Sequence, residues 1–247
     1  MSKTILITGS SSGIGRATAL RFAENGFNVI VNYLNNQNGA EEVVAEIQKM
    51  GAKAIAIKAD VTKEDEVKKL IELSIKEFGT IDILVNNVGG YIDGDEWNGN
   101  LQTWKDTFEK NVISTLNVSK FVIPIFQKEQ KGVIINLASR YCNDGQIDAI
   151  AYAASKATIV NITQAYAKLL APFGRANSVA PGPVNTGYWL RADKEEKDKN
   201  LNMIPMKRFS EPSEIADLIY FLCPDNAKSI TGQNIFIDGG HSNLKIN

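Results

Sequence analysis

The sequence predicts an α/β protein in which one parallel sheet is covered by helices on both faces. Three observations support this fold class. Short apolar runs of strand length alternate with stretches of helix length between residues 4 and 237, as expected when helices connect the strands of a parallel sheet. A glycine-rich turn at 8–15 follows the first apolar run and precedes a helical stretch. Polar, glycine or proline residues then follow most of the later apolar runs.

Length and composition narrow the class of protein. The chain has 247 residues, of which 44% are apolar, which suits one large domain with a sizeable core. A net charge of −1 offers no strongly basic surface for nucleic acid. The first strand begins by residue 4 and no apolar run approaches the roughly 20 residues of a membrane span, so we expect no signal peptide, no membrane segment and a cytoplasmic location.

The cysteines and the histidine give no metal pattern. Cys142 and Cys223 are far apart and lack metal-ligand spacing, and His241 is the single histidine. We therefore expect two free thiols and no metal, and we exclude a Ser-His-Asp hydrolase arrangement.

The expected elements follow in chain order. Each strand is a short apolar run, commonly with β-branched residues; the strands are expected at 4–7, 29–31, 54–57, 81–85, 133–137, 177–180 and 234–237. The helices carry apolar side chains at helical spacing; they are expected at 16–25, 41–50, 64–78, 101–127, 152–170 and 212–222. The charged run 191–202 is either a solvated helix or part of a mobile flap, and its neighbours Tyr188 and Trp189 favour a flap around 186–205 with the aromatic rings inward.

The turn after the first strand is typical of a phosphate site. Its spacing is Gly-x-x-x-Gly-x-Gly, from Gly9 to Gly15. Glycines let the backbone approach a pyrophosphate, and the N-terminus of the following helix attracts negative charge. The spacing differs from the common Gly-x-Gly-x-x-Gly of dinucleotide sites, so a plain connecting loop is the alternative to a nucleotide site.

A tyrosine, a lysine and a serine form a second candidate group. Tyr152 and Lys156 are four residues apart and share one face of a helix, and Ser139 lies thirteen residues upstream. A phenol has an ordinary pKa of about 10, and a nearby ammonium group favours the phenolate and makes the phenol a usable proton donor and acceptor. The Ser139 hydroxyl can hold a carbonyl oxygen while the proton moves. Taken alone, the tyrosine and lysine would be ordinary surface residues.

One geometric rule connects the two groups. Ligands of open parallel sheets bind beyond the carboxyl ends of the strands. Several candidate residues follow expected strand ends and should line one edge of the sheet; these are the glycine turn, Asp60, Asn86, Asn87, Ser139, Pro181 and Gly182. Tyr152 and Lys156 open the helix after the Ser139 loop, so they can face the same cleft.

Together these motifs resemble those of the short-chain dehydrogenase/reductase family over nearly the whole chain. The matching segments are 8–15, 60–61, 86–89, Asn111, Ser139, 152–156 and 181–186. Within the family, the pattern is similar to the 3-oxoacyl-[acyl-carrier-protein] reductase-like branch and to sugar and alcohol dehydrogenases. The resemblance implies a single Rossmann-type doubly wound domain of seven parallel strands. It also implies NAD(P)-dependent hydride transfer between nicotinamide and a carbonyl or secondary alcohol, and a homotetramer that packs through the helices at 101–127 and 152–170.

The resemblance also assigns residue roles. Tyr152 matches the catalytic acid/base, Lys156 the residue that lowers its pKa and binds the nicotinamide ribose, and Ser139 the residue that orients the substrate oxygen. Asn111 matches the catalytic asparagine that supports a water in the proton relay. The implied cofactor-binding residues are Gly9, Ser11, Ser12, Gly13, Ile14, Gly15, Asn35, Asp60, Val61, Asn86, Asn87, Gly89, Tyr152, Lys156, Pro181, Gly182, Val184 and Thr186.

The chain departs from the family pattern at three places. Val88 replaces the usual alanine of the Asn-Asn-Ala-Gly motif, which adds two methyl groups near the cofactor. The segment 174–177 is one residue shorter than the common pattern, which affects the expected register of the sixth strand. Arg140, Tyr141 and Cys142 stand where small residues are frequent, so they are expected to narrow or charge the substrate pocket.

Few residues in the sequence distinguish an NADP(H) site from an NAD(H) site. The region 32–36 has no carboxylate to repel a 2′-phosphate. Ser12 stands where NADP enzymes of the family often carry a cation, whereas Arg16 can reach the phosphate from the first helical turn. These residues favour NADP(H) over NAD(H).

Three functions remain open at the level of the sequence. The first is an oxidoreductase for a small carbonyl or alcohol substrate, including a 3-oxoacyl group on acyl carrier protein; the acidic carrier would need a basic patch, for which the candidates are Arg140, Arg175, Lys207 and Arg208. The second is a sugar, polyol or other alcohol dehydrogenase. The third is a catalytically silent nucleotide-sensing protein, which the complete Asn, Ser, Tyr and Lys set disfavours.

Overall fold

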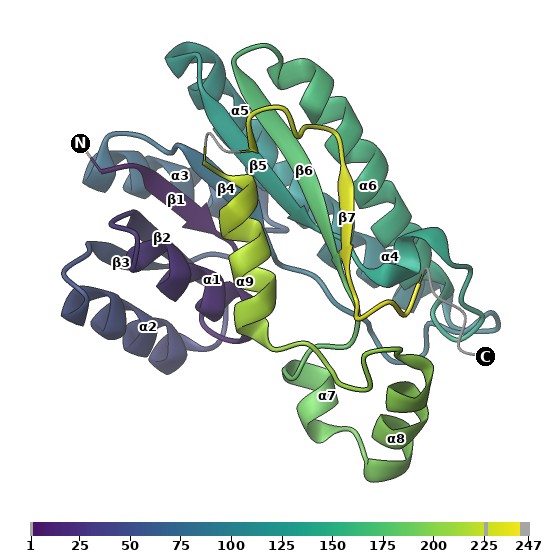
Figure 1. Cartoon of the computed structure of the whole chain (residues 1–247). Helices are drawn as coiled ribbons and strands as arrows, with labels where there is room; N and C mark the ends of the chain where they lie inside the picture. The colour runs from purple at the N-terminus through teal and green to yellow at the C-terminus, as the bar shows by residue number, and fades with distance from the viewer. Residues whose placement is uncertain (1, 225–226, 243–247) are drawn as a thin grey trace.

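A seven-stranded parallel sheet forms the centre of the molecule (Figure 1). The computed structural model describes residues 2–224 and 227–242. The strands are β1 (Thr4–Ile7), β2 (Asn28–Tyr33), β3 (Ala54–Lys58), β4 (Ile83–Asn86), β5 (Gly132–Leu137), β6 (Gly174–Pro181) and β7 (Asn234–Ile237). Their order is β3-β2-β1-β4-β5-β6-β7, so the winding reverses between β1 and β4, where ligands bind in sheets of this type. The predicted fold class is confirmed.

Helices cover both faces of the sheet. One face packs against α1 (Gly13–Ala23), α2 (Gln37–Lys49) and α9 (Pro212–Leu222), and the other against α3 (Glu64–Phe78), α5 (Ser114–Glu129) and α6 (Ile150–Leu170). Strand β1 shows why two cores form: the Ile5 and Ile7 side chains join the first helix layer, and that of Leu6 joins the second. Alternate side chains of a strand point to opposite faces, so a strand buried on both faces is apolar throughout.

Two helices begin earlier than the sequence predicted. Helix α1 starts at Gly13, because two glycines in its first turn hid a start that was expected at residue 16. Helix α2 starts at Gln37 where residue 41 was expected. Its N-cap is Asn36, whose side-chain oxygen accepts a 3.1 Å hydrogen bond from the Gly39 N–H. The polar run before residue 41 therefore contains a helix cap and is not only a loop.

Strand β6 is longer than expected. It begins at Gly174, three residues before the predicted start, and pairs in continuous register with β5, Gly132 opposite Gly174. A Cβ atom on Gly174 would lie 2.7 Å from the Gly132 carbonyl oxygen and 3.3 Å from the Leu170 Cβ atom. Glycine is therefore required here by a close approach within the sheet, which the sequence does not distinguish from a strand-ending glycine.

The long helix expected at 101–127 is interrupted by a π-turn. It consists of α4 (Leu101–Phe108), a π-helical segment η1 (Glu109–Ile113) and α5. The Ser114 N–H donates to the Glu109 carbonyl oxygen, five residues back. Side chains compensate for the changed backbone pattern, since the Ser114 hydroxyl donates to the Lys110 carbonyl oxygen (2.6 Å) and the Thr115 hydroxyl to the Asn111 carbonyl oxygen (3.2 Å). Such π-turns occur frequently at functional sites.

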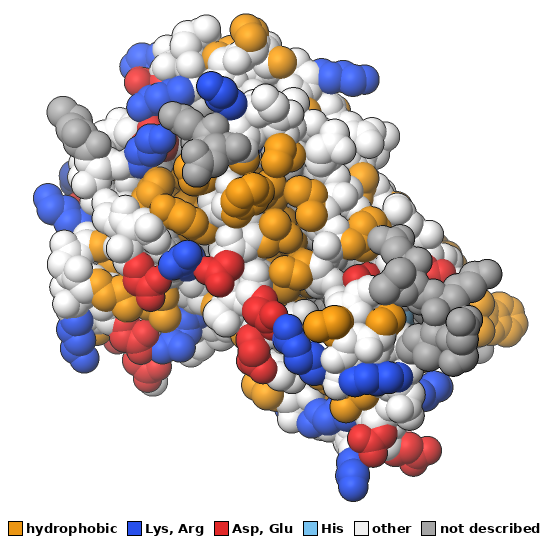
Figure 2. Space-filling model, viewed as in Figure 1, with side chains coloured by type: hydrophobic (Ala, Val, Ile, Leu, Met, Phe, Trp, Pro, Cys, Tyr) orange, Lys and Arg blue, Asp and Glu red, His pale blue; other side chains and the backbone are white. Residues whose placement is uncertain are grey.

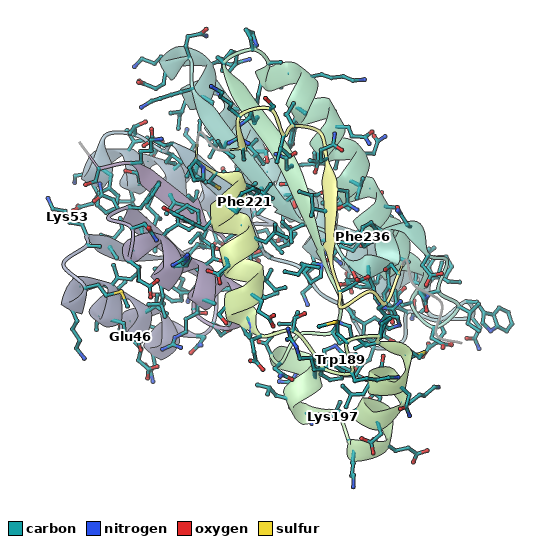
Figure 3. The ribbon with its side chains drawn as sticks, viewed as in Figure 1. Glu46, Lys53, Trp189, Lys197, Phe221 and Phe236 are labelled. Atoms are coloured by element: carbon teal, nitrogen blue, oxygen red, sulfur yellow. The ribbon has the colours of Figure 1, made fainter. Side chains whose placement is uncertain are left out.

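Two short helices project beyond the carboxyl ends of β6 and β7 (Figure 1). They are α7 (Gly187–Arg191) and α8 (Lys194–Met203), and they lie in the segment predicted as a flap. The Tyr188 hydroxyl hydrogen-bonds the Glu196 carboxylate at 2.5 Å and joins the two helices. Figure 3 shows Trp189 next to the strand ends and Lys197 on α8, away from the sheet. The charged run is thus mainly an exposed helix.

None of the helices within the described ranges combines the length and apolarity that crossing a bilayer requires.

Candidate active site

A cleft of about 420 Å³ lies at the edge where the strands end. It brings together twelve of the residues predicted from the sequence. These are Gly9, Ser12, Ile14, Asn87, Gly89, Ser139, Tyr152, Lys156, Pro181, Gly182, Val184 and Thr186. The first three come from the turn after β1, and Asn87 and Gly89 from the turn after β4, so the cleft lies where the winding of the sheet reverses.

Tyr152 is held from several sides within this cleft. The Ser139 side chain is near enough to its phenol to lower the pKa of Tyr152. The rings of Tyr91 and Tyr141 pack edge-on against the Tyr152 ring, with centroids 6.3 and 6.1 Å away. The Ser139 oxygen accepts a 3.3 Å hydrogen bond from the Tyr141 N–H, which leaves the Ser139 O–H free to donate to another oxygen.

The lysine of the predicted pair is anchored to the sheet. Lys156 is 4% exposed, and its Nζ donates a 2.8 Å hydrogen bond to the Leu137 carbonyl oxygen at the end of β5. Burial lowers the pKa of Lys156 to about 8, and repulsion from Lys110 adds to this effect. Burial also lowers the pKa of Lys110.

The expected lowering of the Tyr152 pKa is not seen. Burial raises the pKa of Tyr152 above its ordinary value, and the contact with Ser139 offsets only part of the rise. The expectation rested on helical spacing and on the family resemblance, and neither includes the cost of removing a phenolate from water. Tyr152 is therefore a protonated phenol at neutral pH, in the form that donates a proton.

Asn111 lies behind the cleft and fixes the loop that lines it. Its side-chain oxygen accepts a 2.7 Å hydrogen bond from the Gly90 N–H, and its amide donates to the carbonyl oxygens of Gly90 (3.1 Å) and Thr107 (2.9 Å). Residue 111 lies in the π-turn, so its amide satisfies a helix carbonyl and a loop at the same time. A Cβ atom on Gly89 would lie 2.5 Å from Asn111 Oδ1 and 2.9 Å from Lys156 Nζ. Only glycine allows these polar groups to approach so closely.

The turn after β1 has the geometry of a phosphate cradle. Gly9 and Gly13 have φ values of +62° and +56°, in the region that favours glycine. The N-cap of α1, Ser12, makes no side-chain capping hydrogen bond, so no side chain competes with a ligand there. An uncapped helix N-terminus inside the cleft fits the pyrophosphate of a dinucleotide.

Buried polar groups hold this cradle in place. The Asn32 side-chain oxygen accepts from the Gly9 N–H (3.1 Å), and the Asn87 amide donates to the carbonyl oxygens of Thr8 (2.8 Å) and Gly9 (3.1 Å). The Thr8 hydroxyl accepts from the Asn87 and Val88 N–H groups at 2.9 and 3.1 Å. Asn87 thus joins the ends of β1 and β4, a role that its position at a turn did not indicate.

Seven predicted site residues lie outside the lining of the cleft in addition to Asn111, and six of them lie in or near the turns beyond β1, β2 and β3. Ser11 belongs to the turn and Gly15 is buried in the first turn of α1, and neither lines the cleft. Gly13 lines a groove beside α1. Asn35 is exposed beyond β2, and Asp60 and Val61 lie beyond β3, where the Asp60 carboxylate accepts from the Thr62 N–H and hydroxyl. They occupy the same edge of the sheet, nearer to β2 and β3.

Asn86 also lies outside the cleft, because it belongs to the core. It is the last residue of β4, and its amide donates to the Ser119 hydroxyl (3.1 Å) and the Asn136 side-chain oxygen (2.9 Å). The Asn136 amide continues to the Thr163 hydroxyl at 2.8 Å. The Asn86 side chain thus faces the core, and Asn87 lies on the cleft side, since successive strand residues face opposite sides.

Other lining residues were not assigned to the site from the sequence. They are Val88, Gly90, Lys110, Leu137, Ala138 and Trp189. Val88 had been identified as a departure from the family pattern and Trp189 as part of a flap. No sequence feature assigned Lys110 to the site, apart from its position directly before Asn111. The lining has no carboxylate, so Lys110 and Lys156 make it positively charged.

Arg16 does not extend into the cleft. Its Nη2 pairs with the Glu46 carboxylate on α2 at 2.5 Å. Arg175, one candidate for a basic patch, binds the carbonyl oxygens of Ile230 and Cys223 at the opposite end of β6. The Arg208 guanidinium makes two hydrogen bonds to the Glu214 carboxylate. The four proposed basic residues therefore do not form one patch.

The sequence predicted no metal site. Residues 2–224 and 227–242 contain no group of three His, Cys, Asp or Glu side chains arranged to hold a metal ion.

Comparison with known proteins gives consistent matches over almost the whole chain. A family model described as "Enoyl-(Acyl carrier protein) reductase" matches residues 9–242. The 3-oxoacyl-[acyl-carrier-protein] reductase FabG of Staphylococcus epidermidis is 40% identical over 241 residues, which is 97% of this chain and 99% of the relative. Glucose 1-dehydrogenase 2 of Bacillus subtilis is 35% identical over 96% of this chain and 94% of its own.

Solved structures agree with these relatives. A 7 alpha-hydroxysteroid dehydrogenase complexed with NADH and 7-oxo glycochenodeoxycholic acid superposes with a TM-score of 0.92 at 33% identity, covering 96% of this chain and 93% of the other. A putative short-chain dehydrogenase/reductase from Burkholderia xenovorans superposes with a TM-score of 0.88 at 30% identity, covering 97% and 98%.

Proposed function

Because the chain belongs to the short-chain dehydrogenase/reductase family and is an NAD(P)-dependent oxidoreductase acting on CH–OH groups, we propose that it reduces the 3-oxo group of an acyl thioester. The observation that carries the reaction is the convergence of the Tyr152 phenol, the Ser139 hydroxyl and the Lys156 ammonium in one cleft with the uncapped start of α1. The thioester is supported by relatives named 3-oxoacyl-[acyl-carrier-protein] reductase at 36–40% identity.

The side chains divide the work of the reaction. The Ser139 O–H donates to the carbonyl oxygen of the substrate and places it beside Tyr152. The Tyr152 phenol, protonated at neutral pH, gives its proton to that oxygen as negative charge develops. Lys156 stabilises the phenolate that remains, and Asn111 holds the Gly89–Gly90 wall against it. The bound nicotinamide supplies the hydride.

We propose NADP(H) as the preferred cofactor. No carboxylate stands at the end of β2 to repel a 2′-phosphate, and the exposed side chains of Asn35 and Asn36 can donate to it. Arg16 and Glu46 are 40% and 37% exposed, so their ion pair contributes only about 0–1 kcal/mol and can be exchanged for a phosphate contact. The measured ratio of kcat/KM for NADPH and NADH tests this directly.

A sugar or polyol substrate is the second candidate. The relative named glucose 1-dehydrogenase 2, at 35% identity, favours it. The basic patch expected for an acidic carrier protein is also incomplete, because Arg175 lies at the opposite end of β6. The α7–α8 segment, with Trp189 at the cleft, is proposed to close over either substrate.

Activity measurements separate these candidates. Acetoacetyl-coenzyme A, glucose and simple ketones are tested with NADPH and with NADH, using the wild-type protein and Tyr152→Phe. The expected result is NADPH oxidation with the thioester, and loss of turnover in Tyr152→Phe with retained cofactor binding. Preferred oxidation of glucose would reject the thioester proposal, and unchanged turnover in Tyr152→Phe would reject the catalytic assignment.

A homotetramer and a cytoplasmic location also remain proposals. Exposed apolar side chains support self-association: Leu116 and Leu169 on the long helices, and Phe221 on α9. Figure 2 shows an apolar patch over α9 and β7, and Figure 3 places Phe221 and Phe236 in this region. The mass in solution, measured by light scattering for the wild type and for Phe221→Glu, tests the assembly; a monomeric wild type would reject it.

A further inference from the structure

Asp95 is a buried acid beside the active site that has no part in the functions described above. It lies in the loop between β4 and α4, and its side chain is 0% exposed. Within the described ranges it has no ion pair. A buried carboxylate is costly unless hydrogen bonds compensate for the lost water, so its partners indicate its role.

The partners of Asp95 are the first N–H groups of α6. Its Oδ1 accepts a 2.9 Å hydrogen bond from the Ala151 N–H, and its Oδ2 a 2.6 Å hydrogen bond from the Tyr152 N–H. Its carbonyl oxygen accepts from the Ile150 N–H at 2.9 Å. The residue preceding α6, Ala149, offers no side-chain cap. Asp95 therefore caps α6 from a loop more than 50 residues away in sequence.

Both carboxylate oxygens accept backbone N–H groups, so the ionised form satisfies this cap. A protonated carboxyl would direct an O–H toward a donor at one of the two positions. The positive end of the α6 dipole also favours a negative charge at this place. Burial raises the pKa of Asp95, whereas the hydrogen bonds from Tyr152 and Ala151 lower it.

The same loop also contacts the side chain of Tyr152. Tyr91, four residues before Asp95, packs edge-on against the Tyr152 ring at 6.3 Å. The Trp97 N–H donates to the Ile147 carbonyl oxygen at 3.2 Å and joins the loop to the segment before α6. Loop 91–97 thus holds both the backbone and the ring of Tyr152, while Ser139 approaches its hydroxyl from β5.

We propose that Asp95 is a positioning residue for the reaction: by capping the first turn of α6, it fixes the Tyr152 phenol opposite Ser139 and holds the Tyr91 loop as a wall of the substrate site. This inference rests on the proposed role of Tyr152. Its distinguishing consequence is that loss of the cap lowers turnover while the cofactor cradle at α1 stays intact.

The test compares Asp95→Asn with Asp93→Asn. Asp93 is exposed in the same loop, so its replacement removes the same charge without removing a cap. In Asp95→Asn, one side-chain oxygen is replaced by an NH₂ group that faces a backbone donor. We expect kcat with acetoacetyl-coenzyme A and NADPH to fall about 10- to 100-fold, as a small misplacement of a reacting group does. The dissociation constant for NADPH, measured by its fluorescence, should stay within about twofold of wild type, since the α1 cradle lies elsewhere.

Hydrogen exchange gives a second readout that does not depend on the substrate. The amides of Ala151 and Tyr152 should exchange faster in Asp95→Asn than in Asp93→Asn, while the amides of α1 stay protected. Asp95→Ser keeps one acceptor and should recover part of kcat. If Asp95→Asn is too unstable to purify, the same measurements on Asp95→Ser decide the matter.

The outcomes separate this inference from the proposed function. Wild-type kcat in Asp95→Asn, or equal losses in Asp95→Asn and Asp93→Asn, would overturn the inference. A loss of NADPH affinity as large as the loss of kcat would also overturn it, because that pattern indicates general damage. If Tyr152→Phe is inactive while Asp95→Asn is fully active, only the role of Asp95 fails; if Tyr152→Phe is active, the proposed role of Tyr152 fails first.

Discussion

The Lys156 ammonium group lies 5.8 Å from the centre of the Tyr152 ring and donates its hydrogen bond to the main chain of β5, 2.8 Å away. The sheet therefore fixes the lysine independently of the tyrosine, although both belong to α6. With a pKa lowered to about 8, Lys156 is mostly charged at neutral pH but loses its proton in mildly alkaline solution. The charge of Lys156 therefore depends on pH within the range in which the enzyme can be assayed.

Replacing Lys110 with methionine should shift the pH dependence of the enzyme. Lys110 repels Lys156 and lowers its pKa, so in Lys110→Met the Lys156 pKa rises. The wild-type kcat/KM for NADPH should decline as pH rises through about 8, the value for Lys156, and in the variant this decline should move to higher pH. Lys105→Met, at an exposed position on α4, is the control; an unshifted decline in Lys110→Met would contradict the argument.

The same variant should be more stable at neutral pH. Burial lowers the pKa of Lys110 in the folded protein, so the unfolded chain binds this proton more tightly. Stability then increases with pH between the folded and the ordinary pKa, and below that window the buried charge destabilises the fold. Methionine removes this penalty, and the melting temperature at pH 7 should rise relative to wild type and to Lys105→Met.

Gly89→Ala should strongly lower turnover without unfolding the protein. The new Cβ atom would lie 2.5 Å from Asn111 Oδ1 and 2.9 Å from Lys156 Nζ, and the φ of +155° is one that residues with a side chain rarely adopt. Displacement of these groups by about 1 Å is expected to reduce kcat about 100-fold. Gly145→Ala is the matched control, because its Cβ would meet nothing within 4 Å. A Gly89→Ala enzyme with wild-type kcat would show that Lys156 can move freely.

Asn111→Ala and Asn117→Ala should both lower the stability of the fold, but only Asn111→Ala should lower kcat. Each asparagine joins a long-helix segment to a loop: Asn111 to Gly90, and Asn117 to Thr62 through a 2.8 Å hydrogen bond. Loss of the buried Asn111 side chain leaves polar partners unsatisfied, at a cost of about 1–3 kcal/mol in the free energy of unfolding. The cost is smaller for Asn117, because its hydrogen bond to Thr62 is only partly buried. Only Asn111→Ala should lower kcat, by tenfold or more, since only the Gly90 loop lines the cleft. Equal kcat values would remove Asn111 from the site.

The sequence was sufficient for the features that depend on pattern. Alternating apolar runs predicted the sheet, and the residues after strand ends predicted one edge of it, where Gly9, Asn87, Ser139 and Tyr152 do meet. Such predictions succeed because parallel strands place their carboxyl ends together. The extent of β6 was not predictable in this way, because a glycine in a sheet and a glycine at a turn look the same in sequence.

Features that depend on packing between distant segments could not be predicted from the sequence. Whether Asn86 or Asn87 faces the cleft depends on where β4 ends. The π-turn and the Asp95 cap arise from contacts between distant segments. The raised pKa of Tyr152 follows from burial, which spacing along a helix does not report. Arg16 was expected to reach a phosphate directly, but it is paired with Glu46 on α2, so a phosphate contact requires the exchange of this ion pair.

Asn35→Asp should weaken the use of NADPH while sparing NADH. Asn35 is exposed beyond β2, in the region where a carboxylate in this fold binds the ribose hydroxyls of NAD and repels a 2′-phosphate. Close like charges at a binding surface cost several kcal/mol when desolvated and less when exposed, so we expect kcat/KM for NADPH to fall about tenfold, mainly through KM. With NADH the value should be unchanged or higher. Asn38→Asp adds the same charge three residues later on the exposed start of α2 and should change neither. If Asn35→Asp leaves the NADPH-to-NADH ratio of wild type, the 2′-phosphate does not bind beside this residue, and the preference for NADP(H) loses its structural basis.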